Sequence, residues 1–171
     1  ISISDSSNTI CSQVQGDSAI IVVNPLPVAS IFGTDSVCLN STSARITFKG
    51  QGGTPPYVIK YTLNDTLKEV ITAAGDSVRV KVVTNQIGTF VFKLMSIQDS
   101  SSTVCENLQN DSVYVVVKQL PDASIFGADT VCLNDAEPVI TIKGSGGSSP
   151  YNILYKLNNS SPKLLTTADG D

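Results

Sequence analysis

The chain has 171 residues, of which 15% are charged and 41% are apolar, and its formal net charge is −4. The sparse, mildly acidic charge argues against a nucleic acid or an anionic membrane surface as partner, and no apolar run approaches the roughly 18 residues that a membrane span requires. Histidine is absent, which removes the commonest general base and the commonest metal ligand.

Seven short strands are predicted between residues 28 and 118. Apolar and polar residues alternate with a period of two, and Gly, Pro, Asn and Asp separate the runs, which is typical of half-buried strands joined by turns. In chain order the predicted strands cover 28–32, 44–49, 57–63, 68–73, 78–83, 89–97 and 111–118. No capping signal or 3.6-residue period indicates a helix.

The alternation also predicts which side chains face the core. Ile46 and Phe48 should point inward from the second strand, and Phe90, Phe92 and Leu94 from the sixth. Seven strands with short connections predict an all-β fold, an immunoglobulin-like Greek-key sandwich.

The chain repeats itself at an offset of 94 residues. Matched segments carry nearly the same residues in one register that requires no gap: 6–11 with 100–105, 26–33 with 120–127, 37–40 with 131–134, and 56–57 with 150–151. A unit of this length exceeds solenoid repeats and matches the roughly 100 residues of an immunoglobulin-type sandwich. The sequence therefore predicts sandwiches in tandem.

The repeat divides the chain into three parts. Residues 1–24 are the C-terminal part of one unit, 25–118 are a complete unit, and 119–171 are the N-terminal half of the next. Half a unit cannot bury a core alone, so we expect the natural chain to be longer than these residues. Prolines at the joints 25–27 and 119–121 fix φ and predict stiff connections.

Each unit contributes two cysteines, which are Cys38 and Cys105 in the complete one. Without a CxxC pair or a histidine, zinc is a poor interpretation, and a disulfide in an oxidising compartment fits better. A Cys38–Cys105 bridge would stabilise the unit by about 3–5 kcal/mol and leave Cys11 and Cys132 with partners outside the chain. Two alternatives stay open: a bridge between neighbouring units, because the two connections lie at opposite ends of a simple sandwich, or unpaired buried thiols.

Six Asp-Ser/Thr pairs precede an apolar residue. A turn residue that opens a strand explains this pattern without further function. The pattern also resembles the O-glycosylation signal of exported Bacteroidota proteins, which implies O-glycans on Ser18, Ser36, Thr66, Ser77, Ser112 and Thr130.

No nucleophile–base pair is present, so we predict no catalytic, cofactor or metal site and no enzyme activity. The glycine-rich segments 50–53 and 144–147 lack the Lys-Ser/Thr of a phosphate loop and are interpreted as turns.

Tyrosines spaced by four residues lie on one face of a strand, in the core or on the sheet surface: Tyr57 and Tyr61, and Tyr151 and Tyr155. The alternative function is a carbohydrate-binding module that uses exposed tyrosines or loops.

Five segments carry a resemblance to a known series of repeats: 24–27, 31–33, 37–40, 52–57 and 88–90. They are similar to the PKD-like and immunoglobulin-like repeats of giant Bacteroidota surface proteins, including gliding-motility adhesins of the SprB type. The unit length and the missing tryptophan depart from the family's shorter repeats. The family is therefore better supported than a gliding role.

The resemblance implies export by the type IX secretion system, an extracellular place on the outer cell surface, and many repeats in series. It predicts a structural stalk of a secreted adhesin. Its partners would be neighbouring repeats of the same chain, surface polysaccharide or other cell-surface proteins.

Overall fold

The computed structural model describes residues 1–171 except 34–35, 74, 128–129 and 169–171. The described residues form strands, turns and extended segments, with no helix among them. The strands are β1 (Ser2–Ser4), β2 (Ser12–Val14), β3 (Val28–Gly33), β4 (Ser36–Cys38), β5 (Arg45–Gln51), β6 (Val58–Leu63), β7 (Thr66–Ile71), β8 (Ser77–Lys81), β9 (Gly88–Gln98), β10 (Glu106–Leu108), β11 (Ser112–Lys118), β12 (Asp122–Phe126), β13 (Thr141–Ser145), β14 (Asn152–Tyr155) and β15 (Lys163–Thr166).

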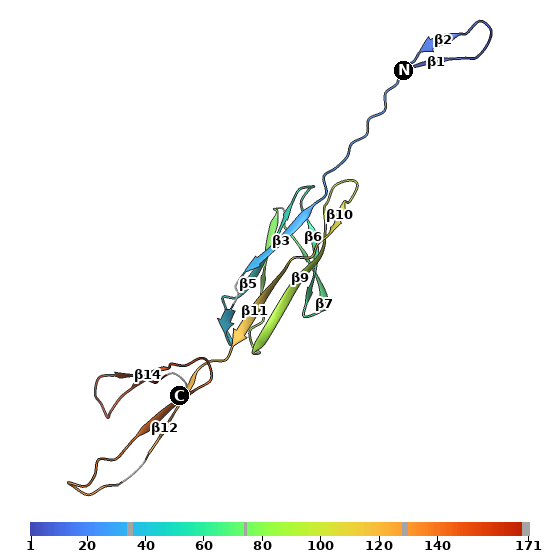
Figure 1. Ribbon diagram of the computed structural model, residues 1–171. Coiled ribbons are helices and arrows are strands. Elements are labelled where there is room, and N and C mark those ends of the chain that lie inside the picture. Colours follow the sequence, from blue (N-terminus) through green and yellow to red (C-terminus); the bar gives the residue numbers. More distant parts are fainter. Residues whose placement is uncertain (34–35, 74, 128–129, 169–171) are drawn as a thin grey trace.

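Strands β3 to β11 build a two-sheet sandwich in the middle of an elongated molecule (Figure 1). One sheet has the order β3-β5-β8, and the other has the order β4-β11-β9-β6-β7, with β10 paired to β9. The first, second and fifth long strands thus oppose the third, fourth, sixth and seventh, which is the arrangement of an immunoglobulin-type sandwich. The predicted all-β sandwich is confirmed.

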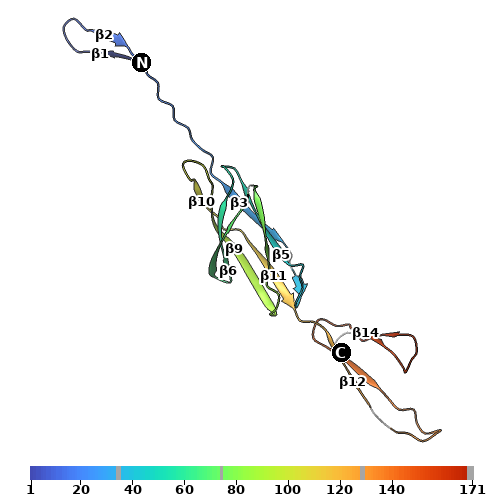
Figure 2. The same ribbon diagram turned by 180° about the vertical axis from the view of Figure 1, so that it is seen from behind.

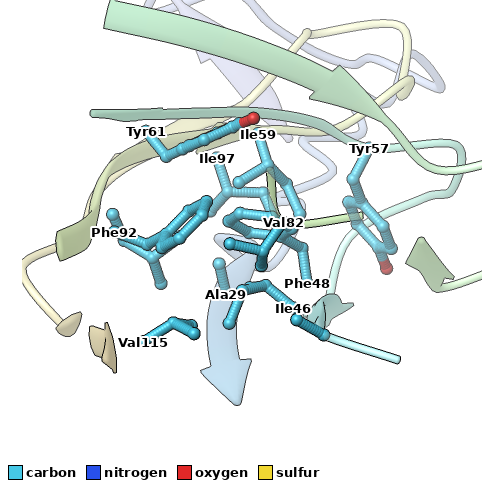
Figure 3. Packing of buried hydrophobic residues seen from close by; sticks show 12 residues of the cluster. Ala29, Ile46, Phe48, Tyr57, Ile59, Tyr61, Val82, Phe92, Ile97 and Val115 are labelled. Atoms are coloured by element: carbon cyan, nitrogen blue, oxygen red, sulfur yellow. The ribbon is translucent and has the colours of Figure 1, made fainter. Parts of the chain in front are cut away.

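The core lies between the two sheets (Figure 3). Phe48 of β5 meets Tyr61 of β6 at a ring-centroid distance of 4.6 Å, and Tyr61 meets Phe92 of β9 at 6.1 Å. These offset aromatic contacts join side chains from both sheets, so apolar burial holds the sheets together. The other fully or almost fully buried apolar residues are Ala29, Ala44, Ile46, Tyr57, Ile59, Val82, Leu94, Ile97, Val115 and Val117.

The predicted strands of the complete unit agree with the structure to within two residues at each end. Ile46, Phe48, Phe92 and Leu94 are buried as expected, and Phe90 packs against the core while partly exposed. The prediction missed β4 and β10, which have three residues each. Segments so short show no alternation.

A β-bulge breaks the alternation in β9. Lys60 of β6 pairs with Ser96, but the next residue, Tyr61, pairs with Leu94. Met95 is the extra residue and is exposed, so Leu94 and Ile97 both face the core although they are three positions apart. Ser96 is buried on the other face, where its hydroxyl donates to Glu106 Oε1 of β10 at 2.7 Å.

The chain on either side of the sandwich forms hairpins (Figures 1 and 2). At the start, β1 pairs with β2, and after the sandwich β12 pairs with β13 and β14 with β15. The β12–β13 register, Asp122 opposite Ser145, is that of β3–β5, Val28 opposite Gln51, shifted by 94 residues.

One part of the predicted repeat register is wrong. In the complete unit Tyr57 N donates to Thr72 Oγ1, whereas Tyr151 N donates to Thr167 Oγ1, so the second pair is separated by one more residue. The turn between β14 and β15 therefore contains one inserted residue. An ungapped comparison of the sequences missed this insertion because the turn is polar in both units. The length of the turn affects only the hairpin that the turn closes.

Candidate functional site

The two ends of the sandwich carry the features that bear on function. We call the end where β3 begins the entry end, and define it by the turn 52–56 and the loop 99–105. We call the end where β11 finishes the exit end, and define it by β4 and residues 118–121.

Asp99 holds the entry end together. Asp99 as a whole residue is 3% exposed. One carboxylate oxygen accepts hydrogen bonds from Ser101 Oγ at 2.8 Å and Cys105 N at 2.8 Å, and the other accepts one from Thr54 N at 3.0 Å. Burial raises the pKa of Asp99, but the hydrogen bonds from Ser101, Thr54 and Cys105 outweigh it and lower the pKa below its ordinary value.

Two further bonds fix the loop 99–105 on the turn 52–56. Ser100 N donates to Thr54 O at 2.8 Å, and Ser100 Oγ donates to Pro56 O at 2.6 Å. The same loop recurs 94 residues earlier, where Asp5 accepts from Ser7 Oγ at 2.9 Å and Cys11 N at 2.8 Å. This loop therefore belongs to the architecture of the unit.

Tyr57 supports the turn from inside the sandwich. Its ring covers Gly50, where a Cβ atom would collide with the ring, and its hydroxyl donates to Gly52 O at 2.5 Å. Burial raises the pKa of the Tyr57 phenol, with smaller contributions from Asp99 and Asp76. Tyr151 repeats the bond with Gly146 O at 2.6 Å. Tyr57 and Tyr61 lie in the core, so neither offers a ring to a sugar.

The exit end carries Cys38. β4 runs parallel to β11 with Cys38 opposite Lys118, and Leu39 N donates to Lys118 O at 2.8 Å. Cys38 is exposed and lines a cleft of about 530 Å³ with Lys118, Gln119 and residues of the segment that follows the sandwich, namely 121–123, 147–148 and 150–154. The cleft therefore lies between the sandwich and the segment that follows it.

The predicted Cys38–Cys105 bridge is absent, and the fold excludes it. Cys38 lies at the exit end beside Lys118, whereas Cys105 precedes β10, which pairs with β9 at Gln98 on the entry end. The ends are separated by the length of the 11-residue strand β9, from Gly88 to Gln98, which is about 36 Å at 3.3 Å per residue. A disulfide needs Cα atoms closer than about 7 Å. All four cysteines are free in this structure.

The predicted O-glycosylation sites are all exposed. Ser36, Thr66, Ser77 and Ser112 are the first residues of β4, β7, β8 and β11, whereas Ser18 and Thr130 lie outside strands. The motif thus marks the start of a strand at four positions. That placement fits the turn interpretation and also leaves the hydroxyl accessible.

In the described part of the chain no group of three His, Cys, Asp or Glu side chains is placed to hold a metal ion. A search of the same residues for a long apolar helix that could cross a membrane found none. Sequence reasoning missed Asp99 and Thr54, although the match of Asp5, Ser7 and Cys11 to Asp99, Ser101 and Cys105 was available as a signal.

No protein-family model matches this chain. No curated protein matches it either. Among solved structures, the chain is similar to the CARDB domain of the PF1109 protein from Pyrococcus furiosus, determined in complex with di-metal ions, with 20% identity and a TM-score of 0.36. The similarity covers 63% of this chain and 99% of that domain.

Proposed function

We propose that the chain is a segment of a structural stalk, built from immunoglobulin-like sandwiches in series, in a secreted cell-surface adhesin. The observation that carries the proposal is a contrast between matched positions. Apolar side chains that are buried in the complete unit are exposed in the flanking parts. At the 94-residue offset, Ile97 is 0% exposed and Ile3 is 64%, and Ile46 is 0% and Ile140 is 53%.

The contrast is strongest where β11 has its counterpart in residues 18–24. Val115 and Val117 are 0% and 2% exposed, whereas their counterparts Ile21 and Val23 are 88% and 87% exposed. Exposure of so many adjacent apolar residues is costly in water. A sandwich that includes these residues would bury them as β11 is buried.

The joints suit a series of such sandwiches. The carbonyl oxygen of Leu26 lies against Gly52, and that of Leu120 lies against Gly146. A Cβ atom added to Gly52 would be 3.0 Å from Leu26 O, and one added to Gly146 would be 2.7 Å from Leu120 O. Both glycines have positive φ, +71° and +63°, which only glycine adopts readily. The chain thus enters each unit through a close backbone contact next to a proline, an arrangement that fixes the direction of the entering segment on the unit that follows.

Placement on the outer cell surface, type IX export and adhesion rest on the resemblance of the repeats. The buried positions of Tyr57 and Tyr61 remove these two rings as a platform on which a carbohydrate-binding module could stack a sugar. The structural role is therefore favoured over the carbohydrate-binding alternative.

The proposal that units follow one another in series can be tested with a longer chain, in which the missing part of the first unit is supplied by the matching residues of the complete unit. Residues 25–94 placed directly before Ile1 restore the repeat register, because residue 1 matches residue 95. Hydrogen–deuterium exchange should then show strong protection of residues 20–23, which are unpaired in the 171-residue chain. Equal, fast exchange of these amides in both chains would contradict the proposal.

The location can be tested separately on the producing cells. An antibody against residues 25–118 should label intact cells, and brief protease treatment of intact cells should remove the signal. Labelling that requires permeabilised cells would contradict a surface stalk.

A further inference from the structure

We propose that Cys38 forms a disulfide with the cysteine that occupies the position of Cys105 in the following unit, so that each joint of the stalk is covalently locked. This inference rests on the proposed function, because it requires units in series. Two observations support it, one from each joint of the chain.

The joint after the sandwich presents the first cysteine. Cys38 lines the cleft together with Gly147, Ser148 and Pro150 of the next unit. These three residues match Gly53, Thr54 and Pro56 in the turn 52–56. The exit-end cysteine therefore faces the entry-end turn of the unit that follows.

In the complete unit that turn is covered by the loop that contains the second cysteine. Asp99 and Ser100 bind Thr54, and Cys105 N closes the loop on Asp99. When the following unit has its own such loop, the loop lies on residues 147–150, at the cleft that Cys38 lines. The cleft is thus the place where the two cysteines of successive units meet.

The joint before the sandwich shows the same meeting from the other side. Asn24 Nδ2 donates to Thr103 Oγ1 at 2.8 Å, and Thr103 Oγ1 lies 3.3 Å from Cys105 Sγ. Asn24 matches Lys118, and Lys118 is the residue opposite Cys38 on the neighbouring strand. Neighbouring strands are about 4.8 Å apart, so the exit-end cysteine of the preceding unit would lie beside Asn24, within a short reach of Cys105.

The exposures also fit this pairing. Cys38 is exposed and Cys105 is partly exposed, so both thiols are accessible to each other and to an oxidant. In the reaction, two S–H bonds break and one S–S bond forms. The two electrons reduce a disulfide oxidant, such as oxidised glutathione, whose two sulfurs take up the two protons and leave as thiols.

The sharpest test uses two complete units, residues 25–118 followed directly by residues 25–118, which preserves the 94-residue spacing. This chain has four cysteines. After equilibration with oxidised and reduced glutathione and isolation of the monomer, thiol titration should find two free thiols. Peptide mass spectrometry without reduction should find one Cys38 peptide linked to one Cys105 peptide.

A matched pair of variants identifies which copies are linked. Cys38→Ser in the first copy should remove the linked peptide and leave three free thiols. The same substitution in the second copy should keep the linked peptide and leave one free thiol. If both variants behave alike, or if the parent chain has no free thiols or four, the proposed connectivity is wrong.

The 171-residue chain provides a second measurement that does not depend on the two-unit chain. None of its cysteines has its proposed partner within the chain, so all four should stay free in the same redox buffer. A Cys38–Cys105 crosslink there would overturn the inference.

Circular dichroism and small-angle scattering of the two-unit chain separate the disulfide proposal from the stalk proposal. Folded, extended units without the bridge refute only the disulfide, whereas a collapsed chain refutes the stalk.

Discussion

The buried carboxylate of Asp99 accepts a hydrogen bond from Thr54 N at 3.0 Å and so joins two loops from different sheet connections at the entry end. The loop 99–105 holds Cys105, and the turn 52–56 contacts the joint residue Leu26 through Gly52. One side chain therefore organises the surface through which a unit meets its predecessor.

Replacing Asp99 with Ala should destabilise the unit. The N–H groups of Thr54 and Cys105 would lose the acceptor that the almost fully buried Asp99 provides, and such a loss is more costly than losing a bond between two exposed groups. We expect the melting temperature of residues 25–118 to fall by several degrees. Asp76→Ala is the matched control, because the Asp76 carboxylate forms an exposed ion pair with Lys49 at 3.5 Å, and losing such a pair should change the melting temperature little. An equal loss for both variants would contradict this role for Asp99.

The same carboxylate should make stability depend on pH. The folded-state pKa of Asp99 lies below its ordinary value of 3.8, so its ionised form contributes stability above that value. This contribution is lost as the pH falls through the folded-state pKa. Urea unfolding between pH 7 and pH 2 should show that the difference between the parent and Asp99→Asn is constant above about pH 5 and shrinks below it. A difference that grows toward low pH would have the wrong sign.

The contrast between complete and flanking units can be measured with two identical substitutions. Ile46→Ala should destabilise the sandwich by about 2–5 kcal/mol, because it leaves a cavity in the core. Ile140→Ala, at the matching position, should have almost no effect, because Ile140 is 53% exposed. Chemical unfolding followed by fluorescence of the tyrosines gives both values. Comparable losses would show that residues 119–171 bury a core of their own.

Tyr57 should contribute through its hydroxyl as well as its ring. Tyr57→Phe keeps the ring over Gly50 but removes the bond to Gly52 O, so we expect a loss of about 1 kcal/mol. Tyr114→Phe is the control, because Tyr114 is 58% exposed on β11. Unchanged stability of Tyr57→Phe would show that the ring alone supports the turn.

O-glycosylation remains a prediction with a direct test. Mass spectrometry of protein from its natural source should find hexose on peptides that contain Ser36, Ser77 and Ser112, all exposed strand starts. The same chain made in a host without this glycosylation provides the mass control. Unmodified peptides from the natural source would leave only the turn interpretation of the motif.

The sequence predicted the seven long strands because alternation with a period of two is strong wherever one face is buried, as in Ile46 and Phe48. It failed where that signal is absent. β4 and β10 are too short to alternate, and the bulge at Met95 changes the phase within one strand.

The cysteine pairing failed for a different reason. Sequence spacing gives the length of a loop but not the end of the sandwich at which each cysteine lies. Only the pairing of β4 with Lys118 and of β10 with Gln98 separates Cys38 from Cys105. Asp99 was missed because its partners, Thr54 and Cys105, are brought together by the fold and not by the order of residues.

The most direct test of the stalk is small-angle X-ray scattering from chains with one, two and three copies of residues 25–118. The 11-residue strand β9 spans about 36 Å, so the maximum dimension should increase by about 35–45 Å with each copy while the cross-section stays constant. A maximum dimension that hardly grows, with a cross-section that widens, would mean that the units fold back on one another and would contradict a stalk.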